Sequence, residues 1–311
     1  LEFRRVRFRS ARADGNERVL EVRGQARALA AVQSVVAGGG RRQQEERMLR
    51  WHEPFTAWLR GRRGAGRGDR LRIEEARLSS PAVEVSAAGT AESSTIQWTL
   101  DLDRLAAEAG EVLALDGVKL AGTARGRLDL ERLPHAAAST ARLSASLSDF
   151  ELAAPGRPPW RDAACSIEAE GSGGGAGGAL LVDQGHARVT AGDDSLEVTL
   201  TGGAIVNVWP MLVGGSRRDG PWLRAAPGAQ AIAADSSLSG DLSRWQARWE
   251  GLVPSTALGG TELGGAVKVS ASLAAAGDSW QITRAGGEVE KLTVKHAGRQ
   301  ISEPRAVASA A

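Results

Sequence analysis

The sequence predicts a mostly β protein, an elongated and curved antiparallel sheet that forms an open groove, with a few short helices. Two observations lead to this fold class. Apolar and polar residues alternate with a period of two over many segments, which is typical of strands that bury one face and expose the other. Short runs rich in glycine, aspartate and serine separate these segments and indicate turns. The length of 311 residues fits one large or two ordinary domains.

The alternation is clearest in one stretch near the first third of the chain. Ile96, Trp98 and Leu100 fall on one face of the expected strand, and Gln97 and Thr99 fall on the other. The same pattern predicts further strands along the rest of the chain. These cover residues 71–85, 118–130, 143–147, 196–200, 267–273 and 292–294.

Helical spacing is confined to four short segments. Residues 29–36 and 41–60 carry apolar side chains at helical spacing, ended by a glycine run in the first case and interrupted by a proline in the second. A third helix is predicted over 101–112. A fourth is predicted over 242–252, with Asp241 as its N-cap.

The last two predicted helices belong to a loose internal repeat. In each copy a strand ends, a short helix follows, and a glycine-containing link leads to another alternating strand. Arg104 and Arg244 lie 140 positions apart, and Gly122 and Gly264 lie 142 positions apart. We therefore predict two related β-rich regions.

Charge is distributed unevenly along the chain. Residues 1–72 hold 18 arginines against 8 acidic residues, a net charge of +10, whereas the whole chain carries only +2. Within this part an Arg-Gly tract could contact lipid headgroups or a membrane surface, and a solvated loop is the simpler interpretation. The tract has no interleaved aromatic residues for base stacking, so a nucleic-acid partner is not expected. The headgroup candidates are Arg60, Arg62, Arg63 and Arg67.

No arrangement of residues indicates catalysis or a metal site. The glycine run 171–178 contains a formal G-x-G-x-x-G, but no helix is expected after it to bind a pyrophosphate. The four histidines are scattered, and the single cysteine, Cys165, is expected to be a packed thiol. The pair Asp193-Asp194 is interpreted as solvated carboxylates in a turn. We therefore expect no enzymatic activity, no cofactor and no metal.

The strand-helix-strand pattern resembles the AsmA-like and TamB-like envelope proteins. The resemblance lies in the segments Ile96–Leu105 and Leu115–Gly126, and it recurs in Leu238–Trp245. In this family a strand ends in a small helix and a V-x-L-x-G strand follows. The basic region 25–70 fits the family less well, and the N-terminal membrane helix of the family is absent, so we expect this sequence to be an internal piece of a longer protein.

The resemblance implies a repeating β-groove that binds the acyl chains of phospholipids or other lipids. It also implies a location in the cell envelope, on the periplasmic side of the inner membrane, and a role in lipid transport or outer-membrane assembly. Attachment to the membrane would come from a segment absent from this sequence. The candidate groove residues are the apolar positions of the predicted strands, namely Ile96, Trp98, Leu100, Val118, Leu120, Leu128, Val267, Val269 and Leu273.

These expectations divide the chain into four regions. An N-terminal strand pair covers residues 1–24, and a basic, partly helical insertion covers 25–70. A first β-groove repeat region covers 71–236, and a second, truncated at the C-terminus, covers 237–311. The alternative function is a structural or adhesive β-rich repeat module that binds protein or carbohydrate through exposed tryptophans.

Overall fold

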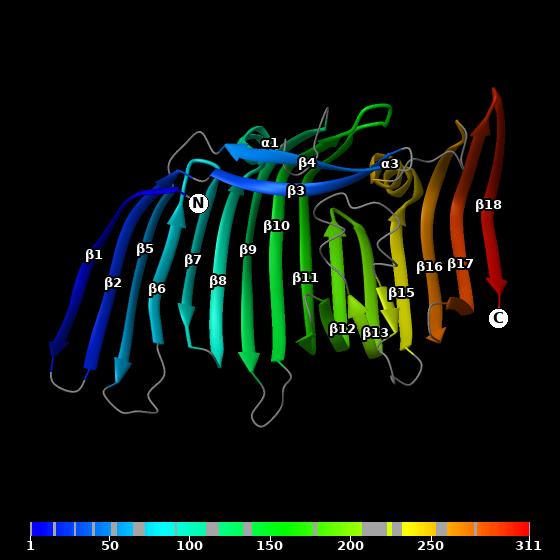
Figure 1. Ribbon diagram of the computed structural model, residues 1–311. Helices are drawn as coiled ribbons and strands as arrows, with labels where there is room; N and C mark the ends of the chain where they lie inside the picture. The colour runs from blue at the N-terminus through cyan, green and yellow to red at the C-terminus, as the bar shows by residue number, and fades with distance from the viewer. Residues whose placement is uncertain are drawn as a thin grey trace. The chain divides into compact units, whose positions relative to one another are not determined.

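The computed structural model describes most of the chain as two compact units, Leu1–Arg132 and Leu133–Ala311. The described residues are 2–14, 17–27, 29–38, 41–50, 55–64, 72–90, 92–109, 118–132, 139–176, 179–206, 223–225, 232–252, 260–276 and 279–310. Both units are built almost entirely of antiparallel strands, with one short helix in each (Figure 1).

The first unit contains a sheet in the order β1-β2-β5-β6-β7-β8-β9 and a separate hairpin of β3 and β4. Consecutive strands of the sheet are antiparallel, and α1 joins β8 to the following strand. The bounds are β1 Glu2–Asp14, β2 Glu17–Arg27, β3 Leu29–Gly38, β4 Arg41–Arg50, β5 Phe55–Gly64, β6 Arg72–Ser79, β7 Val83–Gly89, β8 Ser93–Asp101, α1 Leu102–Ala109 and β9 Lys119–Arg132.

The second unit contains a sheet in the order β10-β11-β12-β13-β15-β16-β17-β18, and the short strand β14 pairs with β13. These neighbours are also antiparallel. The bounds are β10 Ser139–Ala153, β11 Trp160–Ala176, β12 Ala179–Ala191, β13 Asp194–Val206, β14 Leu223–Ala225, β15 Ile232–Asp241, α3 Leu242–Leu252, β16 Glu262–Ala276, β17 Ser279–His296 and β18 Arg299–Ala310.

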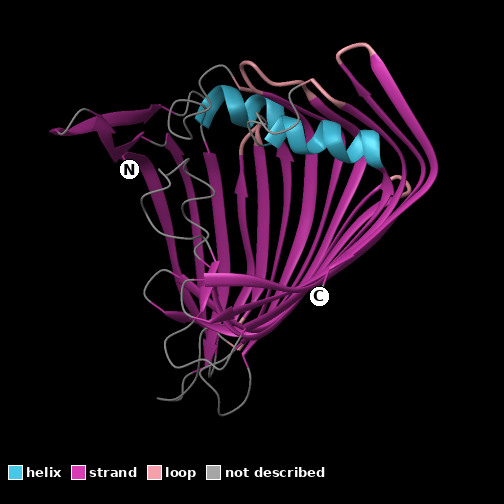
Figure 2. Ribbon diagram, turned by 90° about the vertical axis from the view of Figure 1, so that its right-hand side faces the viewer, coloured by secondary structure: helices cyan, strands magenta, loops and turns pink. Residues whose placement is uncertain are grey.

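The predicted fold class is confirmed. Each sheet is antiparallel and open, because among the described residues β1 does not pair with β9 and β10 does not pair with β18. The strands are visibly bent, so the sheets are curved rather than flat (Figure 2). The helices over 102–109 and 242–252 lie where the sequence predicts them, and the expected helical residues 110–112 fall outside the described part.

Two predicted helices are wrong. Residues 29–36 lie in strand β3, and the described parts of 41–60 lie in strands β4 and β5. The expected insertion over 25–70 is therefore β-stranded rather than partly helical wherever it is described. The physical reason for the first error is that Val32, Val35 and Val36 are β-branched and favour strands, which outweighs their helical spacing. The glycine run after Gly38 precedes an antiparallel partner strand instead of ending a helix.

The two structured helices begin in the same way. Asp101 is the last residue of β8, and its carboxylate accepts a hydrogen bond of 3.0 Å from the Arg104 amide. Asp241 is the last residue of β15, and its carboxylate accepts a bond of 3.1 Å from the Arg244 amide. Each aspartate thus satisfies an amide that the first helical turn leaves without a partner. The two strand-helix-strand segments share this capping arrangement at a spacing of 140 residues.

The pairing register shows why the alternating strands present one apolar face in the first unit. Leu100 pairs with Ala124, Trp98 with Gly126, and Ile96 with Leu128. Paired residues point to the same side of a sheet, so these rows extend from strand to strand. The apolar rows continue through Val83, Val85 and Ala87 of β7, Ala76 and Leu78 of β6, and Ala57 and Leu59 of β5.

One close contact within this face depends on a glycine. A Cβ atom at Gly126 would lie 2.1 Å from the Trp98 ring, so the ring occupies the space that any other residue would fill. The indole thereby lies directly against Gly126 of the next strand. Trp98 is half-buried as a result.

Gly126→Ala is expected to destabilise the first unit by about 1–3 kcal/mol, because the added methyl group must displace the Trp98 ring. The measurement is the free energy of unfolding in urea. The control is Gly286→Ala, since the nearest atom to a Cβ at Gly286 is 3.9 Å away. Equal stability of both variants and the unmodified protein would contradict the contact.

Candidate functional site

The second unit also gathers apolar side chains on one face of its sheet. Leu196 of β13 pairs with Val189 of β12 and with Leu238 of β15, and Leu238 pairs in turn with Val269 of β16. The same rows hold small or aliphatic residues in the outer strands of this sheet. These include Leu143, Ala145 and Leu147 of β10, Cys165, Ile167 and Ala169 of β11, and Ala306 and Ala308 of β18.

The opposite face of the same strands is polar. In β16 the residues between the apolar positions are Lys268, Ser270 and Ser272, and they pair with Ser239, Ser237 and Asp235 of β15. This separation means that a one-residue slip of β16 would bring Lys268 onto the apolar face. The register and the sequence pattern therefore support each other.

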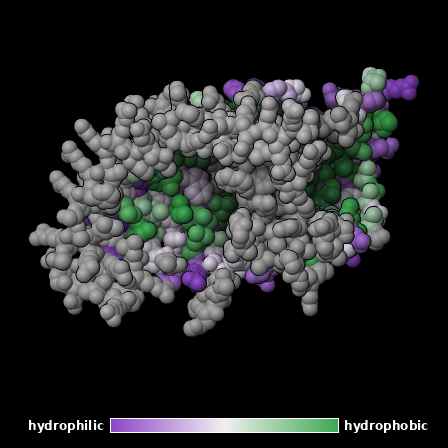
Figure 3. Space-filling model, viewed as in Figure 1, coloured by the Kyte–Doolittle hydropathy of each residue, from purple (hydrophilic) through white to green (hydrophobic). Residues whose placement is uncertain are grey.

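Much of the apolar face is not sealed by other parts of the described chain. Of the residues whose side-chain burial is described, only nine apolar ones are buried, and Leu78 and Val269 remain 39% and 41% exposed. Apolar side chains, drawn in green, gather over β7 to β9 of the first unit and over β15 to β17 of the second (Figure 3). Each unit thus presents an apolar surface that is partly open.

Four of the six predicted groove residues of the first unit lie together on its apolar face. Ile96, Trp98, Leu100 and Leu128 lie together in paired rows of β8 and β9 and are half-buried. Leu120 lies in the part of β9 that extends past the end of β8. Val118 precedes the strand by one residue and is also half-buried.

The predicted groove residues of the second unit all lie on β16. Val267 pairs with Gly240 and Val289 and is only 3% exposed, so it belongs to the core of the face. Val269 is two residues farther along and is well exposed. Leu273 pairs with Ala234 and is half-buried. The predicted residues of β16 thus include a buried one, Val267, and an exposed one, Val269, on the same side of the strand.

Two of the four predicted headgroup arginines form ion pairs with a neighbouring glutamate. Arg60 and Arg62 of β5 both form ion pairs with Glu74, at 2.9 and 2.6 Å. Their charges are therefore partly neutralised, although both side chains remain about half exposed. Arg63 lies in β5 at a position whose side chain is not described, and Arg67 lies outside the described residues.

Helix α3 crosses the end of the second sheet and is held there by buried charges. The carboxylate of Asp194, at the start of β13, is 1% exposed and accepts two hydrogen bonds of 2.7 Å from Arg244. Arg248 donates a further bond of 2.7 Å to Asp194 and two bonds of 2.8 and 2.9 Å to Asp162 of β11. One helix is thereby tied to two strands. The expectation that Asp194 is a solvated turn carboxylate is wrong.

Aromatic groups and a glycine complete this junction. The Arg248 guanidinium stacks on the Trp245 ring at 4.9 Å, and Trp160 donates a hydrogen bond of 2.5 Å to Asp162. A Cβ atom at Gly251 would lie 2.9 Å from the Cβ of Trp160, so the helix backbone packs closely on β11. Phe150 meets Trp160 edge-on at 4.8 Å. Cys165 is buried nearby, as predicted, and desolvation raises the pKa of its thiol.

The charges in this junction stabilise one another. Burial alone would raise the pKa of Asp194, but the hydrogen bonds from Arg244, the Asp241 amide and Arg248 outweigh it and lower the pKa to about 2. The pKa of Asp162 is also lowered, because bonds from Arg248 and Trp160 outweigh its desolvation. The close approach at Asp194 needs Gly240, where a Cβ atom would lie 2.1 Å from the carboxylate.

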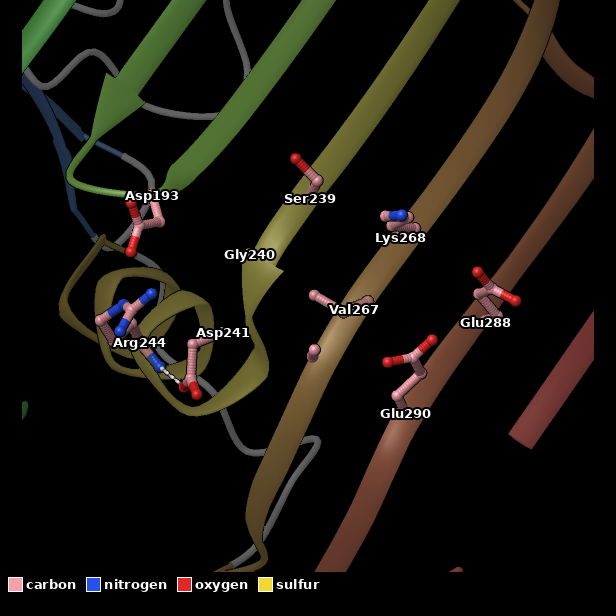
Figure 4. A pocket seen from close by; sticks show the side chains of 10 residues that line it. Asp193, Ser239, Gly240, Asp241, Arg244, Val267, Lys268, Glu288 and Glu290 are labelled. Carbon is pink, nitrogen blue, oxygen red and sulfur yellow. Dashed lines mark hydrogen bonds between the residues drawn. The ribbon is translucent and has the colours of Figure 1, made fainter. Parts of the chain in front are cut away.

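A polar depression of about 410 Å³ lies beside the start of α3 (Figure 4). It lies over β15, β16 and β17, and its charged lining residues are Asp193, Asp241, Arg244, Lys268, Glu288 and Glu290. Four of these charged residues are carboxylates, and Ala266 and Val267 also line the depression. Glu288 already accepts a hydrogen bond of 2.6 Å from Arg305.

Two further findings concern metal ligands and membrane-spanning helices among the described residues. They contain no group of three or more potential metal ligands that could hold a metal ion. No helix among them is long and apolar enough to cross a membrane.

Comparison of the chain with known protein families, with curated proteins and with solved structures finds no match.

Asp194→Asn is expected to destabilise the second unit by about 3–5 kcal/mol, because it leaves Arg244 and Arg248 without a buried counter-charge. The measurement is the free energy of unfolding at neutral pH. The control is Asp193→Asn, which changes the exposed neighbouring carboxylate and should have little effect.

The same pair of variants tests the pH dependence. The pKa of Asp194 is lower in the folded chain than in the unfolded one, so its stabilisation is present above about pH 4 and is lost as the pH falls towards 2. The shift corresponds to roughly 2 kcal/mol. Stability should therefore fall less steeply over this range in Asp194→Asn than in Asp193→Asn, and identical slopes would contradict the buried pairing.

Proposed function

We propose that this chain is a non-enzymatic, lipid-binding segment of a cell-envelope protein of the AsmA-like type. In this proposal acyl chains lie along the apolar face of the sheets, and the chain serves lipid transport or outer-membrane assembly on the periplasmic side of the inner membrane. The observation that carries the proposal is the register, which gathers the apolar side chains of each sheet on one open, curved face. The envelope location rests on the sequence resemblance alone.

The size of the face suits an acyl chain. Eight strands spaced by about 4.8 Å give the second sheet a width of roughly 34 Å. One leaflet of a bilayer has a hydrocarbon thickness of about 15 Å, half of the usual 30 Å. A single tail could therefore lie on this face in more than one position, and movement between positions would exchange one set of small aliphatic contacts for another.

The energetics also favour a lipid ligand. Each buried methylene contributes about 0.8 kcal/mol, so a tail of about 16 carbons could gain on the order of 10 kcal/mol. The headgroup would remain in water. Arg60 and Arg62 could contact it there if their ion pairs with Glu74 were replaced by ion pairs with the headgroup. We expect no cofactor to be required.

The alternative function, binding of carbohydrate or protein through exposed tryptophans, has one observation in its favour. Trp249 of α3 is 61% exposed. Other tryptophans of the described chain have intramolecular roles, since Trp98 lies against Gly126, Trp160 binds Asp162, and Trp245 donates a hydrogen bond of 3.0 Å to Ser239. Among the tryptophans whose side chains the structure describes, Trp249 is thus the exposed one.

Native mass spectrometry of the purified protein, combined with lipid exchange between liposomes, tests the proposal. Co-purified phospholipid and accelerated exchange are the expected results. A lipid-free protein that does not accelerate exchange would contradict it.

Val269→Asp is expected to reduce lipid binding at least tenfold, because a carboxylate would be buried against an acyl chain. The variant should still fold, since this side chain is already 41% exposed. Ser270→Asp is the matched control, because it places the same charge on the polar face of the same strand. If both variants bind lipid as well as the unmodified protein, the apolar face is not the binding surface.

A further inference from the structure

Most charges of strands β1, β2, β5 and β6 lie on one face of the first sheet. The register places Arg7 of β1 opposite Arg23 of β2, and Arg23 opposite Trp58 of β5. Trp58 is in turn opposite Arg77 of β6. Residues opposite one another share a face of a sheet, so these four positions form one row that crosses four strands. The row holds three arginines and no acidic residue.

Two neighbouring rows, each two residues farther along the strands, add to the charge of this face. One row consists of Arg5, Gln25, Thr56 and Ser79, and the other consists of Arg9, Glu21, Arg60 and Glu75. The pairing contains no bulge between these positions, so all three rows lie on the same side of the sheet. Together they hold six arginines and two glutamates, a net charge of +4. These twelve positions form the basic face of the first unit.

The residues between these rows are apolar. Their register positions place them on the opposite side of the sheet, and they are Val6, Phe8, Val22, Gly24, Ala57, Leu59, Ala76 and Leu78. This is the side on which acyl chains are proposed to lie. A ligand of the basic face therefore approaches the sheet from the other side, and the proposed acyl-chain site does not account for the six arginines.

The described arginines of the basic face are accessible, and their ion pairs are exposed. The side chains of Arg60 and Arg77 are 46% and 55% exposed. Arg60 shares Glu74 with Arg62, so these three residues keep one positive charge between them. Arg77 pairs at 3.0 Å with Glu75, which is itself 39% exposed. Ion pairs between exposed side chains contribute little to stability, so both arginines can take another anion as their partner.

The basic face suits the surface of an anionic membrane. Its four strands give a width of about 14 Å, and the five residues from Arg5 to Arg9 give a length of about 14 Å. The positive charges thus extend in two directions, as do the phosphates of a lipid surface. A guanidinium group binds two phosphate oxygens at once, and tryptophan favours the membrane–water interface, where Trp58 would lie. A single nucleic-acid strand would instead need several aromatic side chains along one line.

We infer that the basic face docks on a membrane surface that carries anionic phospholipids. Basic residues near such a surface are attracted by its negative potential, and salt screens this attraction. The inference does not rest on the proposed acyl-chain site, because the basic face and the apolar face lie on opposite sides of the sheet.

Co-sedimentation of the full chain with liposomes tests the inference. Vesicles of phosphatidylcholine with about 30% phosphatidylglycerol are compared with vesicles of phosphatidylcholine alone. Both kinds have the same acyl chains, so a difference reports on the headgroups. We expect at least about tenfold stronger binding to the anionic vesicles at about 50 mM NaCl, and loss of this difference at about 500 mM. Equal binding to both kinds at the lower salt concentration would overturn the inference, and so would tighter binding of a DNA strand of about 20 nucleotides.

Substitutions of Arg77 locate the docking surface. Arg77→Gln removes one charge and should weaken binding to the anionic vesicles about fivefold, whereas Arg77→Glu should weaken it at least about tenfold. Both variants should fold, since this side chain is 55% exposed.

Two controls change charge outside the basic face. Arg142→Glu makes the same change at a 76% exposed arginine of the second sheet, and Val269→Asp adds an acid to the apolar face. Both controls should bind the anionic vesicles like the unmodified protein. Unchanged binding of both Arg77 variants, or an equal loss in either control, would overturn the inference.

Discussion

An antiparallel sheet with one apolar face is stable in water only when something covers that face, and both units of this chain are governed by this requirement. The register gathers the aliphatic side chains of consecutive strands on one side and the charged ones on the other. Helices α1 and α3 lie at the ends of the strands and leave residues such as Leu78 and Val269 open. The open part of the face is therefore the feature on which the proposed function rests, in which an acyl chain would provide an apolar cover that can move.

The attachment of α3 shows how buried charges fix the strand ends. Arg248 joins Asp162 and Asp194, which lie on strands β11 and β13, and Arg244 binds Asp194 from the first turn of the helix. Breaking a buried ion pair costs far more than an exposed one contributes, so this cluster fixes the position of the helix. The aliphatic side chains of the strands then remain available along the rest of the face.

The sequence predicts the strands well because their pattern is local. The alternation from Ile96 to Leu100 can be recognised without knowledge of the rest of the chain. Asp101 and Asp241 indicate the starts of the two helices, because aspartate is a favourable N-cap residue. The buried role of Asp194 could not be predicted, because Arg248 lies 54 residues away and only the sheet order brings the two together. The helix predicted over residues 29–36 is wrong because an aliphatic segment of this length fits both the helical and the strand period, and strand pairing decides between them.

Photo-cross-linking with a fatty acid that carries a diazirine in its acyl chain tests the central claim most directly. If acyl chains lie along the apolar face, the label should appear on that side of β16, on Val269 and Leu273. It should be absent from Lys268, Ser270 and Ser272, whose side chains lie on the other side of the same strand. Labelling without this alternation, or no labelling of β16, would contradict the account.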